Sequence, residues 1–201
     1  MAARKPTPDA GRRSQASRAA ILTAALDLVQ EVGYARLSIE GIAARAGVGK
    51  QTIYRWWRSK GAVLLDSLLA LSEGQDGEVL PLPDTGDLEA DLKLVLRATV
   101  AEMADPRYDR PMRALATEIG HDPALAEEYA VRLDGPLRRL KTERLRSAQR
   151  AGQLPDDLDL DVAIDMIWGP LLHRWLQRSG PLTAGYASAV VDAALDGLRA
   201  R

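Results

Sequence analysis

Residues 38–60 read SIEGIAARAGVGKQTIYRWWRSK, and this stretch decides the fold of the first part of the chain. Ser38 is suited to cap a short helix whose apolar residues, such as Ile39 and Ile42, recur at helical spacing. Gly47 readily adopts the left-handed conformation that ends a helix, and a second short helix is expected to begin near Lys50. Two short helices joined by a tight glycine-containing turn are typical of a helix-turn-helix, which we predict over residues 38–57.

Helical periodicity continues on both sides of this motif. Upstream, an apolar stripe predicts a helix over residues 17–32, and the basic, proline-containing residues 1–16 are predicted to form a flexible arm. Downstream, helices are expected over residues 59–69, 87–103, 111–119, 123–151, 159–178 and 183–199, and Gly135-Pro136 should kink or split the longest of them.

The predicted fold class is therefore all-α, with about nine helices and no strand. We expect a three-helix DNA-binding domain over residues 17–60, followed by a larger helical domain for ligand binding and dimerisation over residues 61–201. The richest interior cluster of Gly, Pro and Asp is SEGQDGEVLPLPDTGD, residues 72–87, which predicts a break between helices.

Charge is distributed unevenly along the chain. Residues 1–60 carry 11 Lys and Arg against 4 Asp and Glu, a net charge of +7, whereas the remainder carries 16 against 24, a net charge of −8. This asymmetry indicates one part that meets a polyanion, although a solvated basic tail would show the same bias. The absence of Cys excludes disulfides and thiolate zinc sites. No apolar run reaches the roughly 18 residues of a membrane span, so we expect a soluble, cytoplasmic protein without a membrane partner.

The second short helix of the motif carries the functional prediction. On a helical wheel, Ile53 and Trp57 share the inner side, and three residues, Gln51, Thr52 and Arg55, point the opposite way. Lys50 lies in the open first turn, and Tyr54 and Trp56 flank the outward face. This cationic face suits the major groove of DNA. A solvent-exposed amphipathic helix is the alternative for such a segment alone, but the paired helix favours DNA.

The segment GIAARAGVGKQTIYRWWRSK, residues 41–60, resembles the DNA-binding signature of the TetR (tetracycline-repressor) family of regulators. Detailed similarity extends over residues 17–65. The resemblance implies a helix-turn-helix that binds operator DNA, with Glu40 at a groove-facing position and Trp57 in the core. The DNA contacts that it implies are Lys50, Gln51, Thr52, Tyr54 and Trp56, together with Ser38 and Lys60 as contacts to the phosphate backbone.

A homodimer on a palindromic operator is expected because one helix-turn-helix makes few contacts, and two of them fit half-sites about 34 Å apart. The last two predicted helices are the most apolar surface available, although the same residues would also serve as internal core. In the resembling family these helices form a four-helix bundle with their mates. The predicted interface residues are Ile167, Leu171, Trp175, Val190, Val191 and Leu195.

An unidentified small-molecule effector is the third expected partner, because the middle helices of the resembling family enclose a ligand cavity. The candidate lining residues of this cavity have polarizable or aromatic side chains and include a few polar atoms. They are Met103, Tyr108, Met112, His121, Tyr129, Met166 and Trp168. Ligand-released repression is the function that this arrangement predicts.

Two other functions compete with this prediction. A helical enzyme with an appended DNA-binding module would use Asp156, Asp157, Asp159 and Asp161 as a metal cluster, but these residues also fit a loop and a helix N-terminus. A nucleoid-type protein would bind DNA without sequence preference. We expect no catalytic residue, no cofactor and no metal, since two His residues without Cys make a poor zinc site.

Overall fold

A computed structural model describes residues 10–72 and 81–199, and these residues form helices without any strand. The chain divides into two compact units. The first unit comprises residues 1–75 and 110–125, and the second unit comprises residues 76–109 and 126–201. None of the described helices combines the length and the apolar character that crossing a membrane requires.

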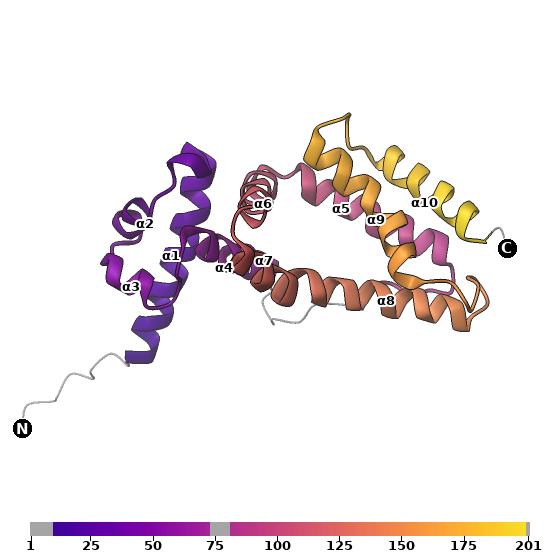
Figure 1. Cartoon of the computed structure of the whole chain (residues 1–201), viewed down its shortest axis with the longest axis horizontal. Coiled ribbons are helices and arrows are strands. Elements are labelled where there is room, and N and C mark those ends of the chain that lie inside the picture. The colour runs from indigo at the N-terminus through magenta and orange to yellow at the C-terminus, as the bar shows by residue number, and fades with distance from the viewer. Residues whose placement is uncertain (1–9, 73–80, 200–201) are drawn as a thin grey trace, which may run out of the picture. The chain divides into compact units, whose positions relative to one another are not determined.

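The first unit is built on its longest helix, α1 (Ala10–Val32), against which α2 and α4 pack (Figure 1). Its other elements are η1 (Tyr34–Arg36), α2 (Ile39–Ala46), α3 (Lys50–Tyr54), α4 (Lys60–Ser72), most of α6 (Pro106–Ile119) and the start of α7 (Pro123–Tyr129). Aliphatic side chains from the α-helices of this unit form its core, including Ile21, Ile42, Ile53, Leu64, Leu115 and Leu125.

Two predicted boundaries differ from the structure. Residues 10–16 belong to α1 instead of a flexible arm, while residues 1–9 lie outside the described residues. A domain end at residue 60 is also incorrect, because α4 belongs to the first unit. The reason is that α4 is apolar on several sides and buries Val63, Leu64 and Leu65 completely.

The second unit contains α5 (Leu88–Ala104), α8 (Gly135–Arg150), α9 (Leu160–Gln177) and α10 (Ala184–Arg199). In Figure 1, α5, α9 and α10 lie alongside one another, and α5 packs on both of the others. The buried side chains that join these helices are Leu92, Leu96, Leu145, Ile164, Ile167, Leu171, Val191 and Leu195.

The long helix predicted over residues 123–151 is continuous but locally widened. Between α7 and α8 lies a π-helical turn, η2 (Ala130–Asp134), where the amide of Gly135 donates to the carbonyl of Ala130. Pro136 has no amide hydrogen and its ring displaces the carbonyl four residues earlier, which accounts for a disturbance at this point. A Cβ on Gly135 would lie 2.8 Å from the Ala130 carbonyl oxygen, so the turn requires glycine there.

Candidate nucleic-acid interface

The turn between α2 and α3 has the geometry that the sequence predicts. The hydroxyl oxygen of Ser38 accepts a hydrogen bond from the amide of Gly41 at 3.1 Å, which caps α2. Gly47 ends the helix in the left-handed region, with φ 67° and ψ 33°. After only two further residues, α3 begins at Lys50. These local features hold α2 and α3 in a helix-turn-helix.

The outward face of α3 is polar and cationic. Ile53 and Trp57 are buried, so they fix which side of the helix faces inward. The side chains on the opposite side are exposed, and Thr52 and Trp56 are half-buried at the edge. The exposed residues are Lys50, Gln51, Tyr54 and Arg55, all of which the sequence places on the DNA-facing side.

Trp57 is anchored by a polar contact as well as by burial. Its indole nitrogen donates to the Oδ2 atom of Asp66 at 2.9 Å. The same oxygen accepts from the Nη2 atom of Arg18 at 2.6 Å. This buried carboxylate on α4 therefore connects the end of the recognition segment to α1, which fixes α3 relative to the rest of the first unit.

Lys50 is paired before any DNA is bound. Its ammonium lies 3.1 Å from the Oε1 atom of Glu40 on α2, and both side chains are more than half exposed. Hydrogen bonds from the backbone amide of Glu40 itself and then from Lys50 lower the pKa of Glu40. The carboxylate is therefore charged at neutral pH and orients the lysine across the front of α2 and α3.

Lys60, expected to contact a phosphate, has internal partners. Its ammonium donates to the carbonyl oxygens of Tyr34 and Leu37, both at 3.1 Å. It also lies 4.2 Å from the centre of the Tyr34 ring. Two of its three N–H groups therefore bind the segment between α1 and α2, and the third N–H can donate to a phosphate.

Comparison with known proteins places this geometry in a family. Residues 21–66 match the model of the bacterial regulatory proteins of the tetR family, and residues 82–194 match that of a tetracyclin repressor-like C-terminal domain. The chain belongs to the TetR family. It is a transcriptional regulator whose N-terminal helix-turn-helix binds operator DNA, as the resemblance of residues 41–60 implied.

Relatives of this TetR-family regulator match it over nearly their full length. The HTH-type transcriptional regulator YdeS of Bacillus subtilis is 35% identical over 94% of this chain and 92% of the relative. The DNA-binding transcriptional repressor TetR of Mycobacteroides abscessus is 30% identical over 90% and 92%.

Solved structures agree with the fold. The crystal structure of the TetR family transcription regulator SCO0332 aligns with a TM-score of 0.72 at 37% identity, over 90% of this chain and 97% of the other. FadR from Bacillus subtilis in complex with stearoyl-CoA aligns with a TM-score of 0.65 over 89% and 98%, and its 19% identity makes it a similarity of fold.

The structure brings together only part of the predicted effector set. Tyr108 and Tyr129 are half-buried in the second unit. The pKa of Tyr108 is raised mainly by burial and further by the neighbouring Glu102 and Tyr129. Burial also raises the pKa of Tyr129. Met103 is half-buried at the end of α5 in the same unit. Tyr108 and Tyr129 therefore lie close to each other, and Met103 belongs to the same unit.

The remaining effector candidates are spread over both units. Met112 and His121 belong to the first unit, where Met112 is buried and His121 is exposed in a turn. Met166 is exposed on α9. Residue type alone selected them, and it does not indicate which side of a helix meets the interior.

Trp168 has a neighbour that the sequence did not single out. The ammonium of Lys141 on α8 lies 4.9 Å from the centre of its ring. Burial lowers the pKa of Lys141. Lys141 lies among other charged residues on its helix, as a surface lysine would. The sequence alone therefore does not indicate that it is half-buried beside Trp168.

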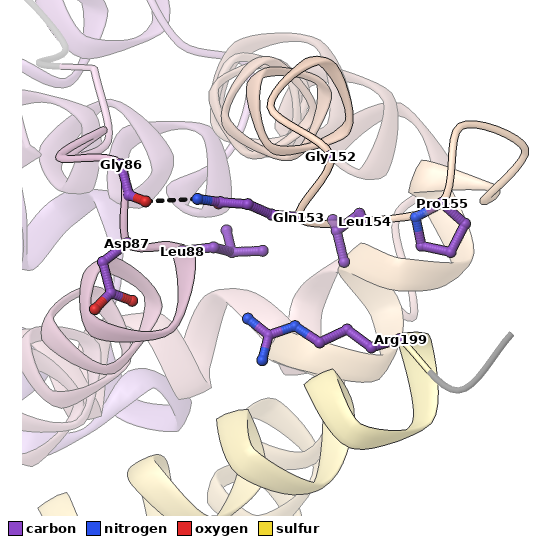
Figure 2. Close-up of a pocket in the computed structure, with 8 residues that line it drawn as sticks. All are labelled: Gly86, Asp87, Leu88, Gly152, Gln153, Leu154, Pro155 and Arg199. Carbon is purple, nitrogen blue, oxygen red and sulfur yellow. Dashed lines mark hydrogen bonds between the residues drawn. The ribbon is translucent and has the colours of Figure 1, made fainter.

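A hollow of about 710 Å³ lies elsewhere in the second unit, where the start of α5, the turn after α8 and the end of α10 meet (Figure 2). The amide group of Gln153 reaches across it to the carbonyl oxygen of Gly86, as Figure 2 shows. Arg199 extends toward the same opening. No predicted effector residue lines this hollow, and its polar groups are mainly those of helix ends.

Five of the six predicted dimer residues lie in the core of a single chain. Ile167, Leu171, Trp175, Val191 and Leu195 are each at most 3% exposed, and Val190 is half-buried. Buried side chains cannot meet a partner, so these residues stabilise the second unit itself. A different face of α9 is exposed and apolar; it carries Val162, Met166, Leu172 and Leu176.

The four aspartates of the competing enzyme hypothesis are not grouped around one possible metal site in the part of the chain that the structure describes. Asp159 caps α9 by accepting from the amides of Asp161 and Val162. Asp161 accepts from the guanidinium of Arg138 at 2.8 Å. Within residues 10–72 and 81–199, no three His, Asp or Glu side chains are grouped to hold a metal ion.

Proposed function

We propose that this TetR-family chain is a one-component repressor that binds a palindromic operator as a homodimer and is released by a small-molecule effector. The observation that carries this proposal is the outward face of α3, which presents Lys50, Gln51 and Arg55 while buried Ile53 and Trp57 hold the helix in place. These side chains suit the edges of guanine and adenine in the major groove. The relative from Mycobacteroides abscessus is a transcriptional repressor, which supports repression over activation.

The homodimer is proposed to form through the exposed face of α9 together with α10. Val162, Met166, Gly169, His173 and Leu176 follow one another at steps of three and four residues, which places them on one side of α9. The Cε atom of Met166 lies 3.8 Å from the position that a Cβ on Gly197 of α10 would take. Small residues on α10 would allow a second copy of this surface to approach closely.

The effector is proposed to bind in the second unit, near Tyr108 and Tyr129. Two half-buried tyrosine hydroxyls, with the carboxylates of Glu102 and Asp134 nearby, suit a small molecule with a few polar atoms. The stearoyl-CoA complex of FadR supports the idea that a protein of this fold accommodates such a molecule. We propose no catalytic function, cofactor or metal for this chain.

An electrophoretic mobility shift with DNA flanking the gene tests the function. The parent chain should retain a promoter fragment and release it steeply as salt rises, because several phosphate contacts displace counterions. Lys50→Ala should lose about tenfold or more in affinity for that fragment but little for random duplex. Equal affinity of the parent for promoter and random DNA would instead indicate a nucleoid-type protein, and a Lys50→Ala variant equal to the parent would contradict the assigned face.

A further inference from the structure

A second polar surface lies beside α3 in the first unit. It is a hollow of about 490 Å³ between the start of α1 and one edge of α3. Its lining contains no acidic residue and consists of Arg13, Ser14, Ser17, Thr52, Arg55 and Trp56. The sequence prediction missed the α1 side because residues 1–16 were expected to be a flexible arm.

Several hydroxyl groups that line this hollow have no hydrogen-bond partner among the residues that the structure describes. The hydroxyls of Ser14, Ser17 and Thr52 make no hydrogen bond to any residue that the structure describes. The guanidinium of Arg55 lies 5.0 Å from the centre of the Trp56 ring, which holds it at the rim. Hydroxyl donors without an acceptor of their own, placed beside a positive charge, are groups that contact phosphate oxygens in protein–DNA complexes.

The position of the hollow relative to α3 identifies the source of such a phosphate. Lys50 and Glu40 lie at the N-terminal end of α3 and on α2, whereas the hollow follows the edge formed by Thr52 and Trp56. A recognition helix in the major groove has a phosphodiester strand along each side. The edge with Thr52 and Trp56 therefore faces one of these strands, and the first turns of α1 extend the protein surface along it.

We propose that this hollow binds a phosphate of the DNA backbone, with Arg13 supplying the positive charge and Ser14, Ser17 and Thr52 supplying hydroxyl donors. The site rests on the proposed DNA-binding function and adds α1 to its footprint. It positions α3 in the groove without reading bases, since a phosphate carries no sequence information.

The experiment compares two adjacent arginines. Arg12→Gln and Arg13→Gln remove the same charge from neighbouring positions, but only Arg13 lines the hollow. Affinity for the promoter fragment is measured by fluorescence anisotropy between 50 and 200 mM KCl. The slope of log affinity against log salt should fall by about 0.9 for Arg13→Gln, as expected for one lost phosphate contact, and by much less for Arg12→Gln. Equal slopes for the two variants would show diffuse electrostatics and overturn the site.

A second pair keeps the test independent of Arg13. Ser17→Asp places a negative charge in the hollow, whereas Ala16→Asp places it on another exposed side of α1. Ser17→Asp should weaken promoter binding on the order of tenfold, and Ala16→Asp should have a clearly smaller effect. Similar effects of the two aspartates would overturn the site alone. A parent chain that retains no DNA would overturn the proposed function together with the site.

Discussion

The ammonium of Lys50 and the carboxylate of Glu40 lie 3.1 Å apart on the DNA-facing side of the first unit. An exposed pair of this kind contributes little to folding stability. It does place a negative charge where a DNA backbone or base edge would approach. We propose that Glu40 opposes contact with arbitrary DNA and favours a site that offers a hydrogen-bond donor to its carboxylate, such as the amino group of cytosine.

Replacement of Glu40 tests this role. Glu40→Gln removes one negative charge and leaves Lys50 unpaired, so affinity for random duplex should rise roughly threefold to fivefold while the ratio of promoter to random affinity falls. Both affinities are measured by anisotropy at one salt concentration. The control is Glu31→Gln, which breaks another exposed ion pair of the same unit, with Arg45 at 2.6 Å. Glu40→Gln weakening both affinities would contradict the assignment.

Helices α5 and α8 are joined by a buried ion pair. The Nη2 atom of Arg144 lies 2.8 Å from the Oδ2 atom of Asp91, and the two residues are 4% and 3% exposed. Thr85 adds two hydrogen bonds to the same carboxylate through its amide and its hydroxyl. Burial on its own would raise the pKa of Asp91, but the hydrogen bonds from Thr85 and Arg144 lower it overall. The pair fixes how α5 and α8 meet.

Removal of this carboxylate should be costly because the buried Arg144 would keep only the more exposed carboxylate of Asp84, 3.5 Å away, as a counter-charge. Asp91→Asn is expected to lower the free energy of unfolding by about 3–5 kcal/mol, measured by chemical denaturation. Asp192→Asn, which breaks a partly exposed pair with Lys93 and leaves Lys93 paired with Glu89, should cost less than about 1 kcal/mol. A similar loss in the two variants would show that the buried pair does not hold α5 to α8.

The lowered pKa of Asp91 predicts that the free energy of unfolding depends on pH. Because the pKa of Asp91 is lower in the folded chain than its ordinary value of 3.8, its stabilisation is present above that pH and declines as pH falls through the lowered pKa. Denaturation from pH 7 to pH 3 should show this decline in the parent. A chain with Asp91→Asn should show a smaller decline; identical pH profiles would contradict the lowered pKa.

At the scale of the whole molecule, function requires two chains, because one helix-turn-helix contacts only one half-site. The face of α9 proposed for the dimer is apolar although it is exposed: Met166 is 42% exposed and Val162 is 51% exposed. An apolar stripe of this length on one helix is a common mark of a protein–protein interface.

Met166→Glu should therefore shift the protein to a monomer, since it places a charge in the centre of the stripe. Sedimentation velocity measures the shift, and promoter affinity should fall with it. Leu94→Glu provides the control, because Leu94 on α5 is 62% exposed and lies on a different helix. Dissociation caused by Leu94→Glu but not by Met166→Glu would place the interface on another surface.

The helix-turn-helix was predictable from sequence because each of its signals acts within a few residues. Ser38 caps its own helix, Gly47 ends it, and Ile53 and Trp57 are one turn apart. The exposed residues of α3 followed from that spacing, and their contacts with DNA stay a prediction. The effector residues have no such local signal, since Met112 and Met166 share a suitable chemistry but lie in different units, and that set stays a prediction.

Helical periodicity and capping are local properties of the chain, so the all-α class, the helix-turn-helix and the outward side of α3 can be predicted from the sequence. Long-range packing sets other features: α1 begins at Ala10, Lys60 is held by two carbonyls, and Ile167 and Leu171 are core while Met166 is exposed. The physical reason is that α9 is apolar almost all round, so its pattern does not specify which side meets its own chain. That choice is made by the helices that pack against it.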